Sequence, residues 1–69
     1  MEMLNEVILD DAHFCNVSLI FSRVDYKECT MYRFAEVING EFNFICEHPV
    51  IDVIYERFEA NVKIQKEKW

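Results

Sequence analysis

The chain has 69 residues, of which 13 are Asp or Glu and seven are Lys or Arg, so its formal net charge at pH 7 is −6. This balance argues against direct binding to nucleic acid, because each phosphate contact needs a Lys or Arg to replace a released counterion. The length allows one domain over residues 1–69, and a hydrophobic content of 52% is too high for a disordered chain. We therefore expect a single small globular domain.

The sequence also indicates a compartment. Its first residues include Glu2 and Glu6, whereas a secretory leader begins with basic residues and continues with an apolar stretch. No apolar run approaches the roughly 20 residues that span a bilayer. Three cysteines, an odd number without framework spacing, are typical of reduced thiols. We expect a cytoplasmic protein with no membrane span.

Two strands are predicted in the first third of the chain. Residues 4–10 contain Val, Ile and Leu in succession and end at Asp10 and Asp11, which is typical of a strand that reaches a polar turn. Residues 13–22 follow, in which Phe14, Val17, Leu19 and Phe21 supply β-branched and aromatic character. The two segments predict an N-terminal hairpin.

A second hairpin is predicted over residues 31–38 and 41–47. Asn39 and Gly40 separate these segments, and Asn-Gly favours the type I′ turn because both residues tolerate positive φ. A two-residue turn would place Val37 opposite Phe42 and Ala35 opposite Phe44.

The same region has an alternative interpretation as a helix over residues 26–38. Asp25 to Glu28 has the form of a capping box, and Met31, Phe34, Ala35 and Ile38 would share one face of a helix that ends at Gly40.

A C-terminal helix is predicted from about residue 49. Pro49 suits a first helical turn, and the helix-spaced apolar residues that follow are Ile51, Ile54, Tyr55, Phe58 and Val62. We expect the helix to reach about residue 60, and the alternation over residues 61–65 leaves open a last strand. The predicted fold class is α+β, a small antiparallel sheet of hairpins with a C-terminal helix.

Four residues are candidate metal ligands. His13 and Cys15 lie two positions apart, as do Cys46 and His48, and residues two apart on a strand point to the same face. If the two pairs lay on neighbouring strands they would form a Cys₂His₂ zinc site, although structural zinc sites usually have two to four residues between paired ligands. The alternative is that the cysteines are small buried hydrophobic residues.

The sequence predicts no enzyme and no cofactor. A single glycine cannot build a phosphate-binding loop or a dinucleotide fingerprint. A nucleophilic mechanism needs a Cys or Ser beside a His base, and the four candidate zinc ligands are the one set that this sequence suggests. We therefore expect a binding function.

The leading hypothesis is a small acidic protein-binding module that docks on a basic surface of a larger macromolecule and inhibits or modulates it. Short acidic chains of this type suit phage-type or mobile-element inhibitors, including proteins that imitate the charge of DNA. The candidate partner-binding residues are Glu36, Glu41, Glu47, Asp52 and Glu56. The alternatives are a homo-oligomeric assembly subunit, such as a homodimer, and a small zinc-binding regulator.

Overall fold

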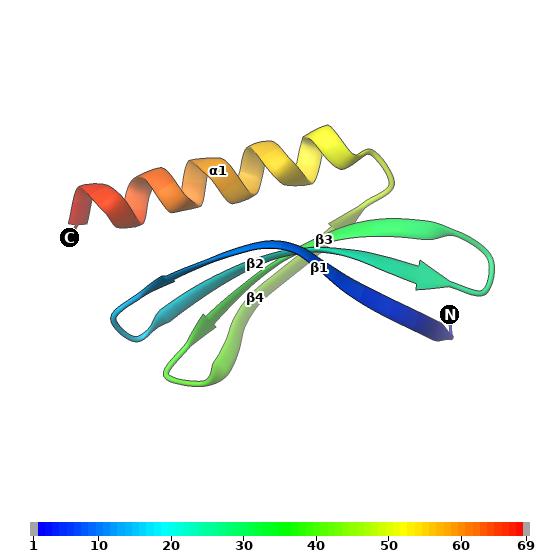
Figure 1. The fold of residues 1–69 in the computed structure, drawn as a ribbon, viewed down its shortest axis with the longest axis horizontal. Helices are drawn as coiled ribbons and strands as arrows, with labels where there is room; N and C mark the ends of the chain where they lie inside the picture. Colours follow the sequence, from blue (N-terminus) through cyan, green and yellow to red (C-terminus); the bar gives the residue numbers. More distant parts are fainter. Residues whose placement is uncertain (1, 69) are drawn as a thin grey trace.

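Four antiparallel strands and one helix make up the computed structural model, which describes residues 2–68 (Figure 1). The elements are β1 (Met3–Phe14), β2 (Val17–Tyr26), β3 (Thr30–Ile38), β4 (Glu41–His48) and α1 (Ile51–Lys68). The strands form one sheet in the order β1-β2-β3-β4, so each strand pairs with its neighbour in sequence. The predicted α+β class is confirmed.

The helix packs on one face of the sheet, which we call the helix face, and the opposite face is the open face (Figure 1). Alternation along β2 places Val17, Leu19 and Phe21 on the helix face, where they are buried against the helix. Phe58 of α1 meets Phe21 with ring centroids 5.9 Å apart. The remaining buried members of this core are Phe34 and Ile54. A core of one sheet face and one helix is small, so each aromatic residue contributes a large share of the stability.

The first hairpin is longer than its sequence predicts. Strand β1 continues through Asp10 and Asp11 to Phe14, and β2 begins at Val17 rather than at residue 13. A register shift between Ile8 and Asp10 gives β1 one extra residue and lets the acidic pair remain in the strand. The chain reverses after Phe14, where Cys15 has a positive φ of 51°.

The second hairpin confirms the strand interpretation of residues 31–38. Asn39 and Gly40 have φ of 54° and 81°, as a type I′ turn requires, and Val37 pairs with Phe42. The helix alternative over residues 26–38 is wrong. A central strand is hydrogen-bonded to neighbours on both sides, and this pairing outweighs the local capping signal.

One predicted pair in this hairpin is also wrong. Ala35 pairs with Ile45 rather than with Phe44, because a register shift between Glu36 and Val37 leaves Asn43 as an extra residue in β4. Side chains beyond a one-residue bulge exchange faces. Phe44 therefore lies on the helix face near Phe34, with ring centroids 6.3 Å apart, while Ile45 lies on the open face.

Helix α1 begins two residues after Pro49, and the Val50 backbone N–H donates a 3.0 Å hydrogen bond to Nδ1 of His48. It continues to Lys68, so the predicted helix is confirmed and the alternative of a last strand over residues 61–65 is wrong. Asp52 in the first turn and lysines in the last turn complement the helix dipole. No helix within residues 2–68 combines the length and the apolar character needed to cross a membrane.

Candidate functional site

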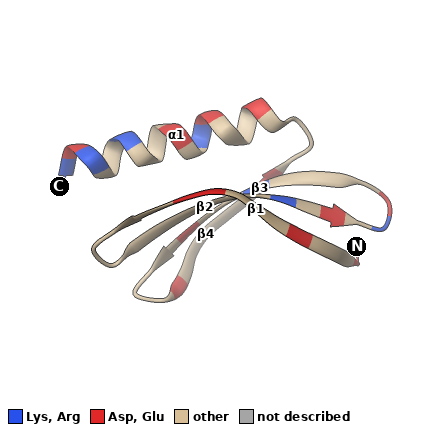
Figure 2. Cartoon of the chain, viewed as in Figure 1, with Lys and Arg blue, Asp and Glu red and all other residues tan. Residues whose placement is uncertain are grey.

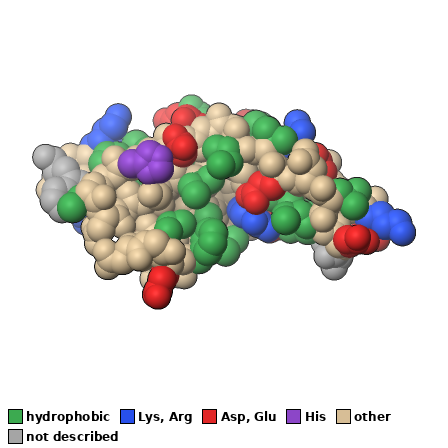
Figure 3. All heavy atoms as spheres, turned by 60° about the horizontal axis from the view of Figure 1, so that its bottom comes forward, with side chains coloured by type: hydrophobic (Ala, Val, Ile, Leu, Met, Phe, Trp, Pro, Cys, Tyr) green, Lys and Arg blue, Asp and Glu red, His purple; other side chains and the backbone are tan. Residues whose placement is uncertain are grey.

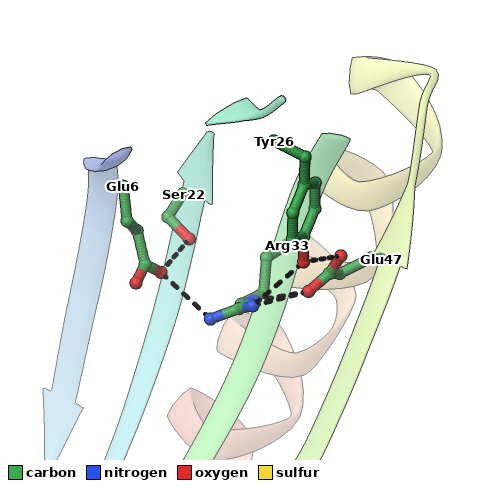
Figure 4. A network of polar contacts seen from close by, with 5 residues as sticks. All are labelled: Glu6, Ser22, Tyr26, Arg33 and Glu47. Atoms are coloured by element: carbon green, nitrogen blue, oxygen red, sulfur yellow. Dashed lines mark hydrogen bonds and ion pairs between the residues drawn. The ribbon is translucent and has the colours of Figure 1, made fainter. Parts of the chain in front are cut away.

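A polar network crosses all four strands on the open face (Figure 4). The strand register places Ser22 of β2, Arg33 of β3 and Glu47 of β4 in one row, and Glu6 of β1 lies diagonally beside them. Tyr26, at the end of β2, completes the group. The network therefore depends on the register of three strand pairs at once.

Arg33 is the centre of this network. Its Nε and Nη2 donate to the same oxygen of Glu47, Oε2, at 2.9 and 2.6 Å, and its Nη1 lies 3.5 Å from Oε2 of Glu6. Tyr26 donates its hydroxyl to Oε1 of Glu47 at 2.6 Å, and Ser22 donates to Glu6 at 2.8 Å. The side chains of Arg33 and Glu47 are 20% and 22% exposed, so these bonds are only partly screened by water.

The hydrogen bonds of the network shift the pKa values of its members. Partial burial alone would raise the pKa of Glu47, but hydrogen bonds from Tyr26 and Arg33 lower it below its ordinary value. The same bond to Glu47 raises the pKa of the Tyr26 phenol. Burial alone would lower the pKa of Arg33, but hydrogen bonds to Glu47 and Tyr26 raise it. The shifts of Glu47 and Arg33 favour the ionised carboxylate and the charged guanidinium, and the shift of Tyr26 favours the neutral phenol that donates to Glu47, as expected for a structural ion pair.

Hydrophobic side chains gather on the same face, beside the charged groups (Figure 3). Phe42 and Ile45 of β4 are 66% and 46% exposed, and Ile8 of β1 is also exposed. Their strand partners place Phe42 beside Val37 and Ile45 beside Ala35 on the open face. This side of the sheet therefore carries exposed apolar side chains beside a polar network.

The negative charge of the protein is concentrated in the sheet rather than in the helix (Figure 2). The four strands hold seven carboxylates against two arginines, a net charge of −5, whereas α1 holds four acidic and four basic residues. The two strand arginines lie on the inner strands, where Arg23 pairs with Asp25 and Arg33 pairs with Glu47. The edge strands β1 and β4 contain acidic residues and neither Lys nor Arg.

The five predicted partner-binding carboxylates do not form one surface. Glu47 belongs to the Arg33 network on the open face, and Glu36 lies on the helix face, where it accepts a 2.7 Å hydrogen bond from Asn43. Glu41 is exposed beside the turn between β3 and β4. Asp52 and Glu56 are exposed on α1. A flat partner could therefore contact only some of these residues at one time.

The predicted zinc ligands lie on opposite edges of the sheet. His13 is in β1 and Cys15 follows it, whereas Cys46 and His48 are in β4, with β2 and β3 between the two pairs. The expected adjacency is wrong because the meander order never brings β1 beside β4. Within residues 2–68, no group of three or more His, Cys, Asp or Glu side chains is placed to hold a metal ion.

A line of Asp, His and Ser side chains crosses the first hairpin, although the sequence pattern did not suggest it. Nδ1 of His13 lies 2.9 Å from Oγ of Ser18, and its Nε2 lies 3.5 Å from a carboxylate oxygen of Asp11. The imidazole and the carboxylate are mostly exposed to water on a sheet surface. The line therefore consists of one hydrogen bond, between His13 and Ser18, and one longer contact, between His13 and Asp11, on the surface of the first hairpin.

A groove of about 450 Å³ runs between β1 and α1, because the helix packs mainly on β2, β3 and β4 and touches β1 least. Its apolar lining comes from Ala12, Phe14, Phe58 and Val62. Its polar lining comes from Asp10, Asp11, Glu59, Lys63 and Lys66. The groove thus joins an apolar lining to charged side chains along the outer strand of the sheet.

Sequence patterns did not reveal the Arg33 network. In the sequence, Arg33 is 14 residues from Glu47 and 27 residues from Glu6, so no short motif contains these three residues. The available signal was weak: an isolated Arg at a predicted strand position with a Glu on the following strand. Their pairing requires the bulge at Asn43, which brings Arg33 and Glu47 directly opposite each other.

No family model, curated protein or solved structure matches this chain.

Proposed function

We propose that this protein is a small protein-binding module that docks on a basic surface of a larger macromolecule and modulates it. The supporting observation is the uneven distribution of charge. The strands have a net charge of −5, the helix has a net charge of zero, and both edge strands lack Lys and Arg. The partner surface is therefore expected to meet the sheet layer rather than the outer side of α1.

Electrostatic attraction gives this docking its physical basis. Carboxylates held on a rigid sheet attract a surface rich in Lys and Arg over distances comparable with the Debye length, about 10 Å at 0.1 M salt. Asp10, Asp11 and Glu41 are exposed on the edge strands, whereas Glu6 and Glu47 are already paired with Arg33. The exposed edge carboxylates would thus supply most of the attraction, and the apolar open face would supply contact area.

This arrangement suits an inhibitor that occupies a groove lined by Arg and Lys on an enzyme of the host cell. A phage-type or mobile-element inhibitor would act by covering such a groove, as a protein that imitates the charge of DNA does. The carboxylates are held by strands, so they lose little conformational freedom on binding.

Affinity capture from a cell lysate at low salt, followed by stepwise elution with salt and purification of the retained protein, tests the proposal. We expect a basic partner whose dissociation constant rises steeply between about 50 and 300 mM salt. A partner that binds equally well at both salt concentrations, or the absence of any retained basic protein, would contradict the proposal.

Matched charge variants locate the contact. Changing Asp11 and Glu41 to their amides removes two negative charges from the edge strands, and changing Asp52 and Glu56 removes the same number from the outer side of the helix. We expect the first pair of changes to weaken binding more than the second. Equal weakening would mean that net charge alone, rather than the sheet layer, directs the docking.

The open face favours one second candidate function, a homodimer that acts as an assembly subunit. Phe42 and Ile45 expose apolar side chains at the β4 edge of that face and Ile8 exposes one at the β1 edge, and exposed apolar surface can mark protein contacts. Sedimentation velocity at micromolar concentration distinguishes the two functions. A dimer that dissociates when Phe42 is changed to Ser would favour the assembly subunit, and a monomer at all concentrations would remove it.

A further inference from the structure

We propose that β1 binds an extended, basic segment of another protein as a fifth strand of the sheet, with the groove beside α1 receiving alternate side chains of that segment. This inference rests on the proposed protein-binding function and assigns it a place and a recognition pattern. Three features support it: the edge position of β1, the groove, and the distribution of charge along the strand.

Strand β1 is a long edge strand. It has 12 residues and pairs with β2 on one side, and no other strand within residues 2–68 pairs with its other side. An edge strand presents backbone N–H and C=O groups that can pair with an added strand. Its register shifts, between Met3 and Asn5 and between Ile8 and Asp10, leave residues 10–14 as a regular stretch. That stretch borders the groove.

Edge strands are usually protected against unwanted pairing by charged residues, especially Lys, by Pro, by β-bulges, or by a covering segment. The two register shifts of β1 lie before residue 10, so residues 10–14 have no such irregularity. Strand β1 contains neither Lys nor Pro, and several of its large hydrophobic side chains are exposed. Its acidic residues are Glu6, Asp10 and Asp11, and it contains no Lys or Arg. These acids disfavour a second copy of β1 as the added strand, because that copy would bring three more carboxylates and no Lys or Arg to the same edge.

The register shows what each side of an added strand would meet. Asp10, Ala12 and Phe14 point to the helix face and line the groove, whereas the side chains of Asp11, which also borders the groove, and His13 point to the open face. Side chains of a neighbouring strand lie beside these residues in the same alternation. Positions opposite Ala12 and Phe14 would therefore be apolar, and positions opposite Asp10 and Asp11 would be Lys or Arg.

The helix side of the groove has a matching polarity. Asp10 and Glu59 both line the groove. Both also raise the pKa of the Tyr55 phenol, Glu59 mainly through a hydrogen bond and Asp10 through its charge. Lys63 and Lys66 follow Glu59 along the helix. A basic side chain is thus favoured at the Asp10 end of the groove and disfavoured beside the lysines.

These constraints define a five-residue pattern. The added segment pairs antiparallel to β1. From its amino end, its five positions are an apolar residue, any residue, a second apolar residue and then two basic residues. The pattern begins opposite Phe14 and ends opposite Asp10. Backbone hydrogen bonds would supply much of the affinity, and the alternate side chains would supply the specificity.

A blocked heptapeptide, Thr-Val-Thr-Val-Lys-Lys-Thr, tests the inference. Titration into the isotope-labelled protein at low salt, followed by amide chemical shifts and hydrogen exchange, should perturb and protect amides of residues 10–14 in β1. The charge-reversed peptide Thr-Val-Thr-Val-Glu-Glu-Thr should not bind. Perturbation centred on the open face instead, equal binding of the charge-reversed peptide, or no binding at millimolar peptide would overturn the inference.

Matched variants give a quantitative test. Changing Asp10 and Asp11 to Asn should weaken peptide binding roughly five- to tenfold, since two exposed ion pairs are lost. The local backbone should tolerate the change, because an amide at position 10 can still accept the hydrogen bond that the Asp11 backbone N–H donates to Oδ1 of Asp10. The control changes Asp52→Asn and Glu56→Gln remove the same amount of negative charge, and peptide affinity should stay within about twofold.

If the double variant does not fold, Asp11→Asn alone provides the same comparison with a smaller expected effect. An equal loss of affinity in the helix control would overturn recognition by β1. The proposed function fails separately, when no basic protein is retained from lysate at low salt. A retained basic partner that does not protect the amides of residues 10–14 would leave the proposed function intact and contradict the β1 site.

Discussion

Truncating Phe58 to Ala should detach the helix from the sheet or unfold the protein. Phe58 is 4% exposed and packs against Phe21 in the core of the helix face. A buried Phe removes on the order of 150–250 Å² from water, which at about 25 cal/mol per Å² corresponds to about 4–6 kcal/mol. Because Ala keeps part of that contact, we expect a loss of about 3–5 kcal/mol in the free energy of unfolding. A core of this size supplies roughly 3–5 kcal/mol in total.

Urea denaturation followed by far-UV circular dichroism measures this loss, with Phe58→Leu as a milder variant that should remain folded. Ile64→Ala is the matched control on the same helix: Ile64 is 49% exposed, so we expect a change within about 0.5 kcal/mol. A loss below about 1 kcal/mol for Phe58→Ala, or an equal loss in the control, would refute the argument that this core holds the helix.

Three further predictions concern the network, the second hairpin and metal. Because the folded state lowers the pKa of Glu47, its stabilising contribution is present above the unfolded pKa of about 4.3 and is lost as the pH falls through the folded value. Glu47→Gln should therefore lower the free energy of unfolding at pH 7 by about 1–3 kcal/mol. It should also make that free energy depend less steeply on pH on the acid side, and an unchanged slope there would contradict the prediction. Gly40→Ala should cost about 1 kcal/mol in a thermal melt, because φ at position 40 is +81° while the added Cβ meets no atom within 4 Å. A stabilising effect would contradict the turn assignment. Chelation with EDTA should leave the melting temperature unchanged, and elemental analysis should find zinc well below one atom per chain; stoichiometric zinc would require a different arrangement of the strands.

The open face shows most clearly what sequence reasoning could not reach. Arg33 and Glu47 are ordinary strand residues in the sequence, and Phe44 and Ile45 are equally apolar neighbours. The extra residue at Asn43 decides that Phe44 lies on the helix face and that Ile45 lies on the open face. A one-residue shift in pairing moves every later side chain to the other face, and local patterns do not record such a shift.

The sequence by itself determined the elements that depend on local chemistry. Asn39 and Gly40 tolerate positive φ and set the second hairpin, and the helical spacing of Ile54 and Phe58 predicted the C-terminal helix. Composition determined the acidic character of the protein. Each of these properties depends on residues that are close in the chain or on simple counts.

Tertiary structure alone decided where the hairpins join and where the charge lies. In the folded protein, β1 extends past Asp10 and Asp11, and the candidate metal ligands lie on opposite edges of the sheet. Both edge strands lack Lys and Arg. The physical reason is that strand order and register arise from contacts between distant segments, whose free energy depends on the packing of the whole sheet against the helix.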